Sequence, residues 1–264
     1  MLKNNDKKIE NLRQLGGYEG KDGRKVKENL LYRSGGLNLS EEELGAILEP
    51  LKITTVFDLR ADDETKASSY TLPQGIEYRH RPIFNSLKDQ MLALNPSQAA
   101  VKAEGFSIQD VSLEMLMGMG DFLSDTYKLM AQKSHAFGDL IKEIIELEGE
   151  PLLFHCSAGK DRTGILAALL MLALGVSRQD VIENYMLSNQ YRKDELERYL
   201  SFAGRMTKNP EVLKIIEGVL MVKEEYIEGF LASVESYPGF DSYAEDCLGL
   251  KKEDLEALRK IYLY

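Results

Sequence analysis

The sequence predicts an α/β protein with a central mixed β-sheet flanked by helices. Short apolar runs rich in β-branched residues, such as Ile53–Leu59 and Leu152–His155, alternate with longer stretches of helical length. The run Leu152–His155 also leads through a loop of small and polar residues into Ile165–Leu174, which has the composition of a buried helix and stops at Gly175. A strand, a tight loop and a helix in this order are typical of ligand sites in α/β folds.

The N-terminal elements follow from local signals. Leu15–Tyr18 and Leu30–Arg33 are β-prone runs separated by a segment rich in Gly, Lys and Asp, so they predict a hairpin. Ser40–Glu43 has the spacing of a capping box and opens a helix that ends before Pro50. After the strand predicted at Ile53–Leu59, Ile76–Ile83 predicts another strand.

Residues 86–149 form a predicted helical insertion. Its methionines are unusually dense: Met91, Met115, Met117, Met119 and Met130. Methionine fills irregular gaps between helices, so one interpretation is a packed core. The other is a mobile helical lid over the active site.

The C-terminal part, residues 176–264, is predicted to be helical. Ser177 caps one helix, Asn209–Glu211 starts another, and Leu250–Leu263 is amphipathic. A chain of 264 residues can bury one large core. We therefore expect one domain over residues 1–264, with the insertion and the C-terminal helices as parts of it.

Charge and cysteine content narrow the function classes. The formal net charge of −10 disfavours a nucleic-acid-binding protein, and it means that an anionic substrate needs a local positive site. Two cysteines, Cys156 and Cys247, do not make a disulfide framework, and Cys247 is expected in the core. The polar N-terminus has no apolar stretch that would serve as a signal peptide, and no stretch reaches membrane-spanning length. We expect a cytoplasmic protein, with a secreted form whose leader has been removed as the alternative.

The loop His155–Gly164 has the residue types that bind and cleave a phosphate ester. Cys156 lies six positions before Arg162, and the apolar helix follows directly. A thiol at a helix N-terminus and beside a cation ionises more readily, and the thiolate is the nucleophile. The planar fork of Arg162 matches two phosphate oxygens, and unpaired amides at the helix start can bind the others. The sequence therefore predicts Cys156 as the nucleophile and Arg162 as a catalytic phosphate ligand.

The other loop residues have expected roles as well. Gly159 tolerates the backbone angles that a curled loop demands. Thr163 could donate a hydrogen bond to the sulfur of Cys156, and His155 is expected to orient the loop rather than to carry a proton. We expect the substrate phosphate to be bound by Ser157, Ala158, Gly159, Lys160, Asp161, Arg162 and Thr163.

This loop resembles the phosphate-binding loop of cysteine-based protein tyrosine phosphatases. Its Gly-Lys-Asp-Arg version is similar to that of atypical bacterial phosphatases that act on phosphotyrosine, other phosphoamino acids and phosphoinositides. Further similar stretches occur in the expected order: Asn11–Tyr18, Leu31–Gly35, Val56–Arg60, Val176–Asn189 and, more loosely, Tyr243–Leu258. The resemblance implies a central mixed sheet flanked by helices, with the phosphate loop at its C-terminal edge. It also links Lys160 to inositol-lipid head groups, and it makes residues 85–140 the least familiar part of the chain.

The general acid is less clearly marked. In the resembled family an aspartate follows a strand before the phosphate loop, but here the sequence after Ile83 is Phe84–Ser86. Asp161 is the favoured acid and base because its place in the loop fixes its distance to the phosphate; its other role would be to pair with a base and shape the loop. Asp58, at the end of a strand, is the second candidate, and its other role would be an ion pair with Arg60. Two aspartates of the insertion have less support: Asp89 and Asp121.

These residues predict a phosphomonoester hydrolase that works through a cysteinyl-phosphate. A protein tyrosine phosphatase of broad specificity is favoured; phosphoinositides or inositol phosphates are the alternative substrates, motivated by Lys160, with Arg60 as a further phosphate contact. Phosphate, sulfate and vanadate should also bind the loop.

A catalytically silent phosphate-binding module and an enzyme handling sulfur or arsenate are the rival classes. We expect no cofactor and no metal, since His80 and His135 lack partners at metal-ligand spacing.

Overall fold

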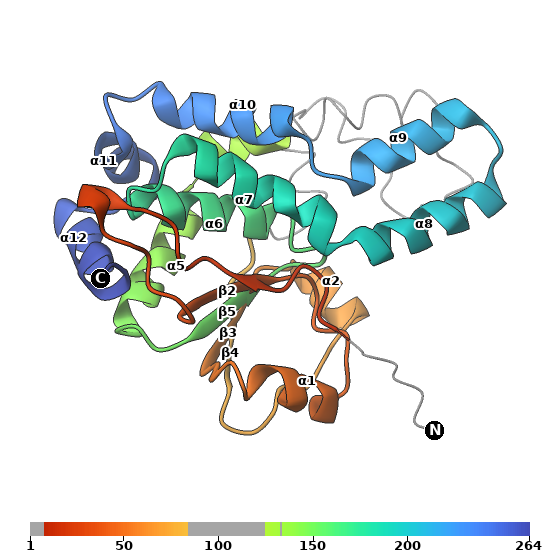
Figure 1. Cartoon of the computed structure of the whole chain (residues 1–264), viewed down its shortest axis with the longest axis horizontal. Helices are drawn as coiled ribbons and strands as arrows, with labels where there is room; N and C mark the ends of the chain where they lie inside the picture. Colours follow the sequence, from red (N-terminus) through yellow and green to blue (C-terminus); the bar gives the residue numbers. More distant parts are fainter. Residues whose placement is uncertain (1–7, 84–124, 133) are drawn as a thin grey trace.

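The computed structural model describes residues 8–83, 125–132 and 134–264. Its centre is one five-stranded sheet (Figure 1). The strands, in spatial order, are β1 (Arg13–Gln14), β2 (Leu31–Ser34), β5 (Leu152–His155), β3 (Thr55–Asp58) and β4 (Glu77–His80). The last four strands run parallel to one another, and β1 pairs with β2 in the antiparallel sense. The predicted mixed α/β sheet is therefore confirmed.

Side chains of the central strands alternate between two cores. One set faces the larger core, and it comprises Leu31, Phe57, Leu152 and Phe154. The other set faces a smaller core, and it comprises Tyr32, Val56 and Leu153. Helices α5 (His135–Glu146) and α6 (Arg162–Ala173) contribute to the larger core, and α1 (Glu41–Leu48) contributes to the smaller one. Because both faces of the sheet are covered, every residue of the three central strands β2, β5 and β3 is buried.

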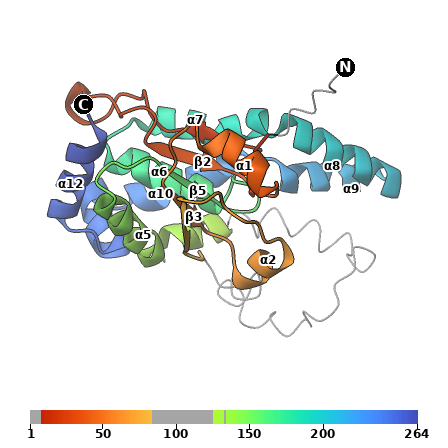
Figure 2. The same ribbon diagram turned by 90° about the horizontal axis from the view of Figure 1, so that it is seen from below.

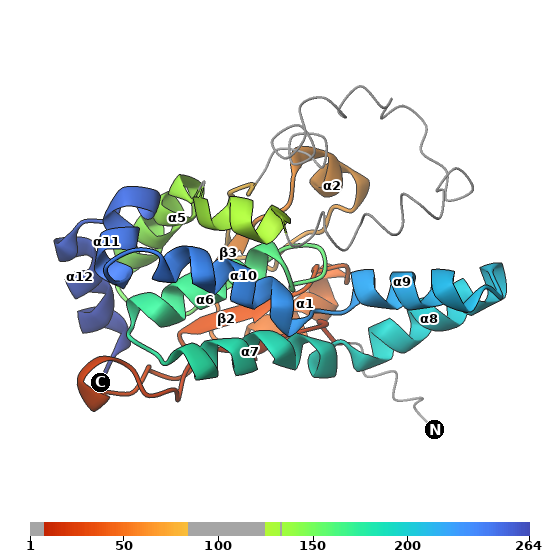
Figure 3. The ribbon, with the colours of Figure 1, turned by 90° about the horizontal axis from the view of Figure 1, so that it is seen from above.

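The remaining helices surround this centre. They are η1 (Lys21–Gly23), α2 (Asp62–Ala67), α7 (Arg178–Tyr191), α8 (Lys193–Met206), α9 (Pro210–Leu220), α10 (Glu224–Glu235), α11 (Phe240–Tyr243), η3 (Ala244–Leu248) and α12 (Lys252–Tyr262). Helices α8 and α9 extend away from the sheet as a pair (Figures 1 and 3). The η1 turn lies beside α12 (Figure 2), where Val26 bridges to Leu263.

Helix starts follow the sequence signals closely. Ser40 and Glu43 form the predicted capping box, Ser177 accepts from the amide of Asp180, and Asn209 accepts from the amide of Glu211. The first predicted strand is shifted, because regular pairing covers Arg13–Gln14 rather than 15–18. A Cβ on Gly16 would lie 2.4 Å from the Cα of Glu28, so the two segments cross too closely there for a regular ladder.

The part of the predicted insertion that the structure describes is helical. Residues 125–132 form a helix, and Met130 is only 1% exposed, as expected of a gap-filling core residue. The other four methionines and the two aspartates named for the insertion lie outside the described residues. The lid and the single domain over residues 1–264 therefore stay predictions.

Candidate active site

The loop after β5 lies where three strand ends meet. In the sheet register, His155 at the end of β5 is level with Ser34 on β2 and Asp58 on β3. Cys156 follows this level directly, and α6 begins at Arg162. The central strand therefore delivers the cysteine to the C-terminal edge of the sheet, at the N-terminus of a buried helix.

The loop carbonyls are held from outside the loop. Gly159 has φ +65°, and a Cβ on it would lie 2.3 Å from the carbonyl oxygen of Ser34, so this close approach requires glycine. Asn11 Nδ2 donates to the carbonyl oxygens of Gly159, at 2.7 Å, and Ala158, at 3.3 Å. In a trans peptide the C=O and N–H groups point in opposite directions. The amides of Gly159 and Lys160 are therefore turned toward the inside of the curl, where they can bind an anion.

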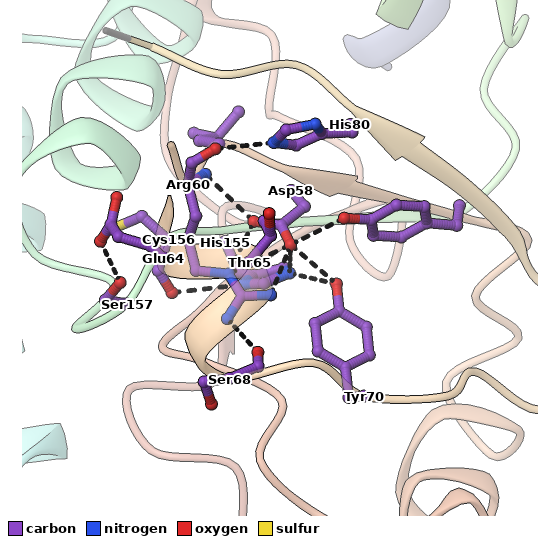
Figure 4. A network of polar contacts seen from close by, with 12 residues as sticks. Asp58, Arg60, Glu64, Thr65, Ser68, Tyr70, His80, His155, Cys156 and Ser157 are labelled. Carbon is purple, nitrogen blue, oxygen red and sulfur yellow. Dashed lines mark hydrogen bonds and ion pairs between the residues drawn. The ribbon is translucent and has the colours of Figure 1, made fainter. Parts of the chain in front are cut away.

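Glu64 of α2 is bound at the mouth of the loop. The guanidinium of Arg162 donates from Nη1 to Glu64 Oε2 at 2.5 Å and from Nη2 to Oε1 at 2.8 Å, and Ser157 Oγ donates to Oε1 at 2.5 Å. Figure 4 shows Glu64 beside Ser157 and Cys156. Burial opposes ionisation of Glu64, but Arg162 and Ser157 prevail and lower its pKa to about 2. Cys156 is buried, with 2% of its surface exposed.

Asp161 is the candidate acid that lies in the loop itself. Its Oδ1 accepts from Lys160 Nζ at 2.9 Å and from the hydroxyl of Tyr127 at 2.6 Å, and Tyr185 in turn donates to that hydroxyl at 2.7 Å. Burial favours the neutral carboxyl, but Lys160 and Tyr127 prevail and lower the pKa of Asp161. The free protein therefore holds Asp161 as a carboxylate, oriented by two donors.

Asp58 is placed differently. Its side chain is fully buried, and Arg60 binds it through Nε at 2.9 and 3.1 Å and through Nη2 at 2.7 Å (Figure 4). Tyr78 donates to the same carboxylate at 3.0 Å. Burial opposes ionisation of Asp58, but Arg60 and His155 prevail and lower its pKa to about 2. This geometry matches the structural role weighed for Asp58, and it leaves the buried guanidinium of Arg60 bound to a partner rather than facing a second phosphate.

His155 and Thr163 complete the predicted set. His155 is fully buried, its Nδ1 is 3.2 Å from the carbonyl oxygen of Cys156, and its Nε2 is 2.6 Å from the hydroxyl of Tyr70. Burial lowers the pKa of His155 to about 4, so the ring is neutral at pH 7 and fixed by both nitrogens. The hydroxyl of Thr163 is buried and has no hydrogen-bond partner among the described residues, so the expected bond to the sulfur is not formed.

Sequence reasoning did not anticipate Glu64 or Tyr127. A signal for Glu64 existed, because the chain after Asp58–Arg60 continues with three acidic residues, and Glu64 caps the amide of Ala61 as the third residue of a helix. Tyr127 comes from a helix and lies 34 residues before Asp161, and no local pattern marks it as a partner of that aspartate.

Within residues 8–83, 125–132 and 134–264, no group of three His, Cys, Asp or Glu side chains is arranged to hold a metal ion. Over the same residues, no helix has both the length and the apolar character needed to cross a bilayer.

Comparisons with known proteins give consistent similarities. The model of a family described as the tyrosine phosphatase family matches residues 5–264. A chain of Cupriavidus necator whose name places it among the tyrosine-protein phosphatases is 29% identical over 256 residues, covering 97% of this chain and 86% of that one. The triple specificity protein phosphatase PtpB of Mycobacterium tuberculosis is 27% identical over 254 residues, covering 88% and 90%. Among solved structures, TpbA of P. aeruginosa has 16% identity, coverage of 80% and 90%, and a TM-score of 0.30.

Proposed function

Because this chain belongs to the tyrosine phosphatase family, we propose that it hydrolyses phosphotyrosine in proteins through a phosphate ester of Cys156. The observation that supports this most strongly is the position of Cys156 at the start of a loop whose Gly159 carbonyl is bound by Asn11 and whose last residue, Arg162, begins α6. An anionic nucleophile and a bidentate phosphate ligand then share one small volume, as in-line displacement at phosphorus requires.

The proposed first step transfers the phosphoryl group to sulfur. The Cys156 thiolate attacks phosphorus, an S–P bond forms, and the bond from phosphorus to the tyrosine oxygen breaks. Arg162 and the loop amides bind the three equatorial oxygens, whose charge they stabilise. Asp161 gives its proton to the departing phenolate. Because a bound phosphate dianion adds negative charge beside Asp161 and draws on Lys160 and Arg162, substrate binding raises the pKa of this carboxyl toward the protonated form.

The second step regenerates the enzyme. Asp161, now a carboxylate, accepts a proton from water as the water oxygen attacks phosphorus. The S–P bond breaks, inorganic phosphate forms, and the electron pair returns to the Cys156 thiolate. Each proton and electron pair is balanced within the two steps, and no further reactant is needed.

The exposure and position of Asp161 suit a general acid better than those of Asp58. Its carboxyl is 28% exposed and lies within the loop, whereas the Asp58 carboxyl is fully buried and held on both oxygens by Arg60. A proton donor must reach the leaving oxygen, so Asp58 would first have to break its buried ion pair with Arg60.

The surroundings of Lys160 bear on which class of phosphate ester the protein prefers. Lys160, which the resemblance links to inositol lipids, is buried, and its ammonium group donates to the Asp161 carboxylate at 2.9 Å. Binding of a second phosphate by Lys160 would therefore have to compete with this ion pair, which favours phosphotyrosine over phosphoinositides. Phosphate release from phosphotyrosine, phosphoserine and phosphothreonine peptides and from phosphoinositide head groups, measured side by side, tests this preference.

The deciding variant is Cys156→Ser. We expect it to lose phosphate release while it still binds a phosphotyrosine peptide, because the amides and Arg162 are unchanged. Near-normal release by Cys156→Ser would overturn the mechanism. Peptide binding by the wild type without any phosphate release would instead identify a phosphate-binding module.

A further inference from the structure

Arg33 is a buried cation directly behind the phosphate loop. Its side chain is fully buried on β2, its Nη2 donates to the carbonyl oxygen of Gly159 at 2.8 Å, and its Nη1 donates to Asn184 Oδ1 at 3.0 Å. Both acceptors are neutral. None of the ion pairs in the described part of the chain includes Arg33, and its Nε has no hydrogen-bond partner there.

The loop and the following helix are shaped around this guanidinium. A Cβ on Gly164, in the first turn of α6, would lie 3.6 Å from Nη2 of Arg33 and 3.1 Å from the ring of Tyr185. Arg33 therefore lies between the Gly159 carbonyl and the start of α6, on the underside of the loop. A second buried arginine, Arg13, donates to the carbonyl oxygen of Asn184 at 2.9 Å, and it also has neutral partners.

The other cations at the loop are each matched by a carboxylate. Arg162 is bound by Glu64 at 2.5 and 2.8 Å, and Lys160 is bound by Asp161 at 2.9 Å. Each of these two pairs therefore has no net charge. Arg33 is therefore a positive charge at the loop that these carboxylates leave unbalanced.

The remaining titratable groups near Arg33 do not balance it either. His155 is neutral at pH 7, because burial lowers its pKa to about 4. The ring of Tyr185 lies beside Gly164, and its hydroxyl donates to that of Tyr127 at 2.7 Å; burial raises the pKa of both phenols well above the ordinary value, so both are neutral. The hydroxyl of Tyr18 accepts from Asn184 Nδ2 at 3.2 Å. Arg60 is paired with Asp58.

Burial of a guanidinium without a carboxylate partner is unfavourable, so a nearby negative charge would stabilise Arg33. In the sheet register Arg33 on β2 pairs with Phe154 on β5, and Cys156 follows two positions later in the same core cluster as Phe154, so Arg33 and Cys156 lie on the same side of the sheet. Burial lowers the pKa of Arg33, and Cys156 acts in the opposite direction. Cys156 is the loop group that can supply the missing negative charge, because its thiol can ionise.

Resting on the proposed function of Cys156, we propose that Arg33 is a positioning residue whose buried guanidinium is the counter-charge of the Cys156 thiolate. Arg33 keeps the sulfur ionised from beneath the loop, while Arg162, already paired with Glu64, binds the substrate phosphate. The thiolate in turn compensates for the burial of Arg33 in the free enzyme.

The test is the pH dependence of alkylation of Cys156 by iodoacetamide, followed by the mass of the peptide that contains Cys156. Because only the thiolate reacts, the midpoint of this dependence reports ionisation of the sulfur. We expect Arg33→Met to move the midpoint upward by about one to two pH units, the usual effect of removing a close opposite charge. Arg33→Lys keeps the charge and should restore most of the shift.

Asn184→Asp tests the same idea without removing Arg33. The new carboxylate would lie where Asn184 Oδ1 now accepts from Arg33 at 3.0 Å, and it would compete with the sulfur for the guanidinium. The alkylation midpoint should again move upward. This variant decides the question even if Arg33→Met does not fold.

Arg192→Met is the matched control. Arg192 is equally buried, but it donates to Glu195 at 2.7 Å and to the carbonyl oxygen of Leu220 at 2.8 Å. Its removal should lower the melting temperature and leave the alkylation midpoint unchanged. An unchanged midpoint in Arg33→Met or Asn184→Asp, or an equal shift in Arg192→Met, would overturn the role of Arg33. The proposed function would fail separately, through an active Cys156→Ser variant.

Discussion

The carboxylate of Glu64 binds both terminal nitrogens of the Arg162 guanidinium, at 2.5 and 2.8 Å. This pairing comes from α2, which follows β3, and it joins two parts of the chain almost one hundred residues apart. A bidentate pair fixes the plane of a guanidinium as well as its position. Glu64 therefore fixes the plane of the Arg162 guanidinium, and under the proposed function this is the orientation in which Arg162 would meet a phosphate.

Glu64→Gln should lower kcat/KM for a phosphotyrosine peptide by about 10- to 100-fold. A neutral amide offers one acceptor oxygen where the carboxylate offers two, and a hydrogen bond to a charged group contributes about 1.5–3 kcal/mol. Steady-state kinetics at fixed pH measure the effect. An equal or higher kcat/KM would mean that Glu64 competes with substrate for Arg162 instead of orienting it.

Asp161→Asn should remove the high-pH limb of the kcat profile. A general acid must be protonated, so the rate falls as pH rises through the pKa of Asp161 in the substrate complex, and asparagine has no such step. The maximal kcat should also fall by about 10²-fold or more. Asp58→Asn should keep the limb. Loss of the limb in Asp58→Asn alone would transfer the acid role to Asp58.

Tyr127→Phe should move that high-pH limb upward by about one unit. The Tyr127 hydroxyl donates to the ionised Asp161 and stabilises its charged form, so its removal raises the pKa of Asp161 and keeps the acid protonated to higher pH. Tyr226→Phe is the control, because Tyr226 stacks on the Tyr127 ring with centroids 5.7 Å apart but is outside the chain of hydroxyls from Tyr185 to Asp161. A limb that stays in place in Tyr127→Phe would contradict this account.

Gly159→Ala should destabilise the fold by at least about 2 kcal/mol and abolish turnover. Its φ of +65° is unfavourable for alanine, and the added Cβ would collide with Ser34 at 2.3 Å. Gly204 in α8 has nothing within 4 Å of an added Cβ, so Gly204→Ala should instead stabilise by about 0.5–1 kcal/mol. Urea unfolding of both variants gives the comparison. A neutral Gly159→Ala would mean that the loop does not need this close approach.

Much of the fold could be predicted because the signals are local. The capping serines, the β-branched runs and the apolar helix after Arg162 each depend on neighbours within a few residues. The shifted first strand shows the limit. A close crossing of Gly16 over Glu28 decides where the pairing ends, and only the folded chain shows that crossing.

Of the candidate site, the sequence predicts mainly the residues of the loop His155–Gly164. The sequence pattern predicts Cys156 and Arg162 in one loop, but the partners of Arg162 and Asp161 come from α2 and from residues 125–132. The sequence likewise gives no sign that Arg33 lies behind the loop, because this position depends on the pairing of β2 with β5 in the sheet. Long-range pairing in the sheet creates these contacts, and it leaves no periodic pattern in the sequence.

The most direct test of the central claim is to trap the covalent intermediate. Wild type and Asp161→Asn are mixed with a phosphotyrosine peptide, denatured rapidly during turnover and digested. We predict phosphate bound to the sulfur of Cys156, because both proposed steps pass through this ester. Continued phosphate release with an unmodified Cys156, or with phosphate on another side chain, would contradict the account.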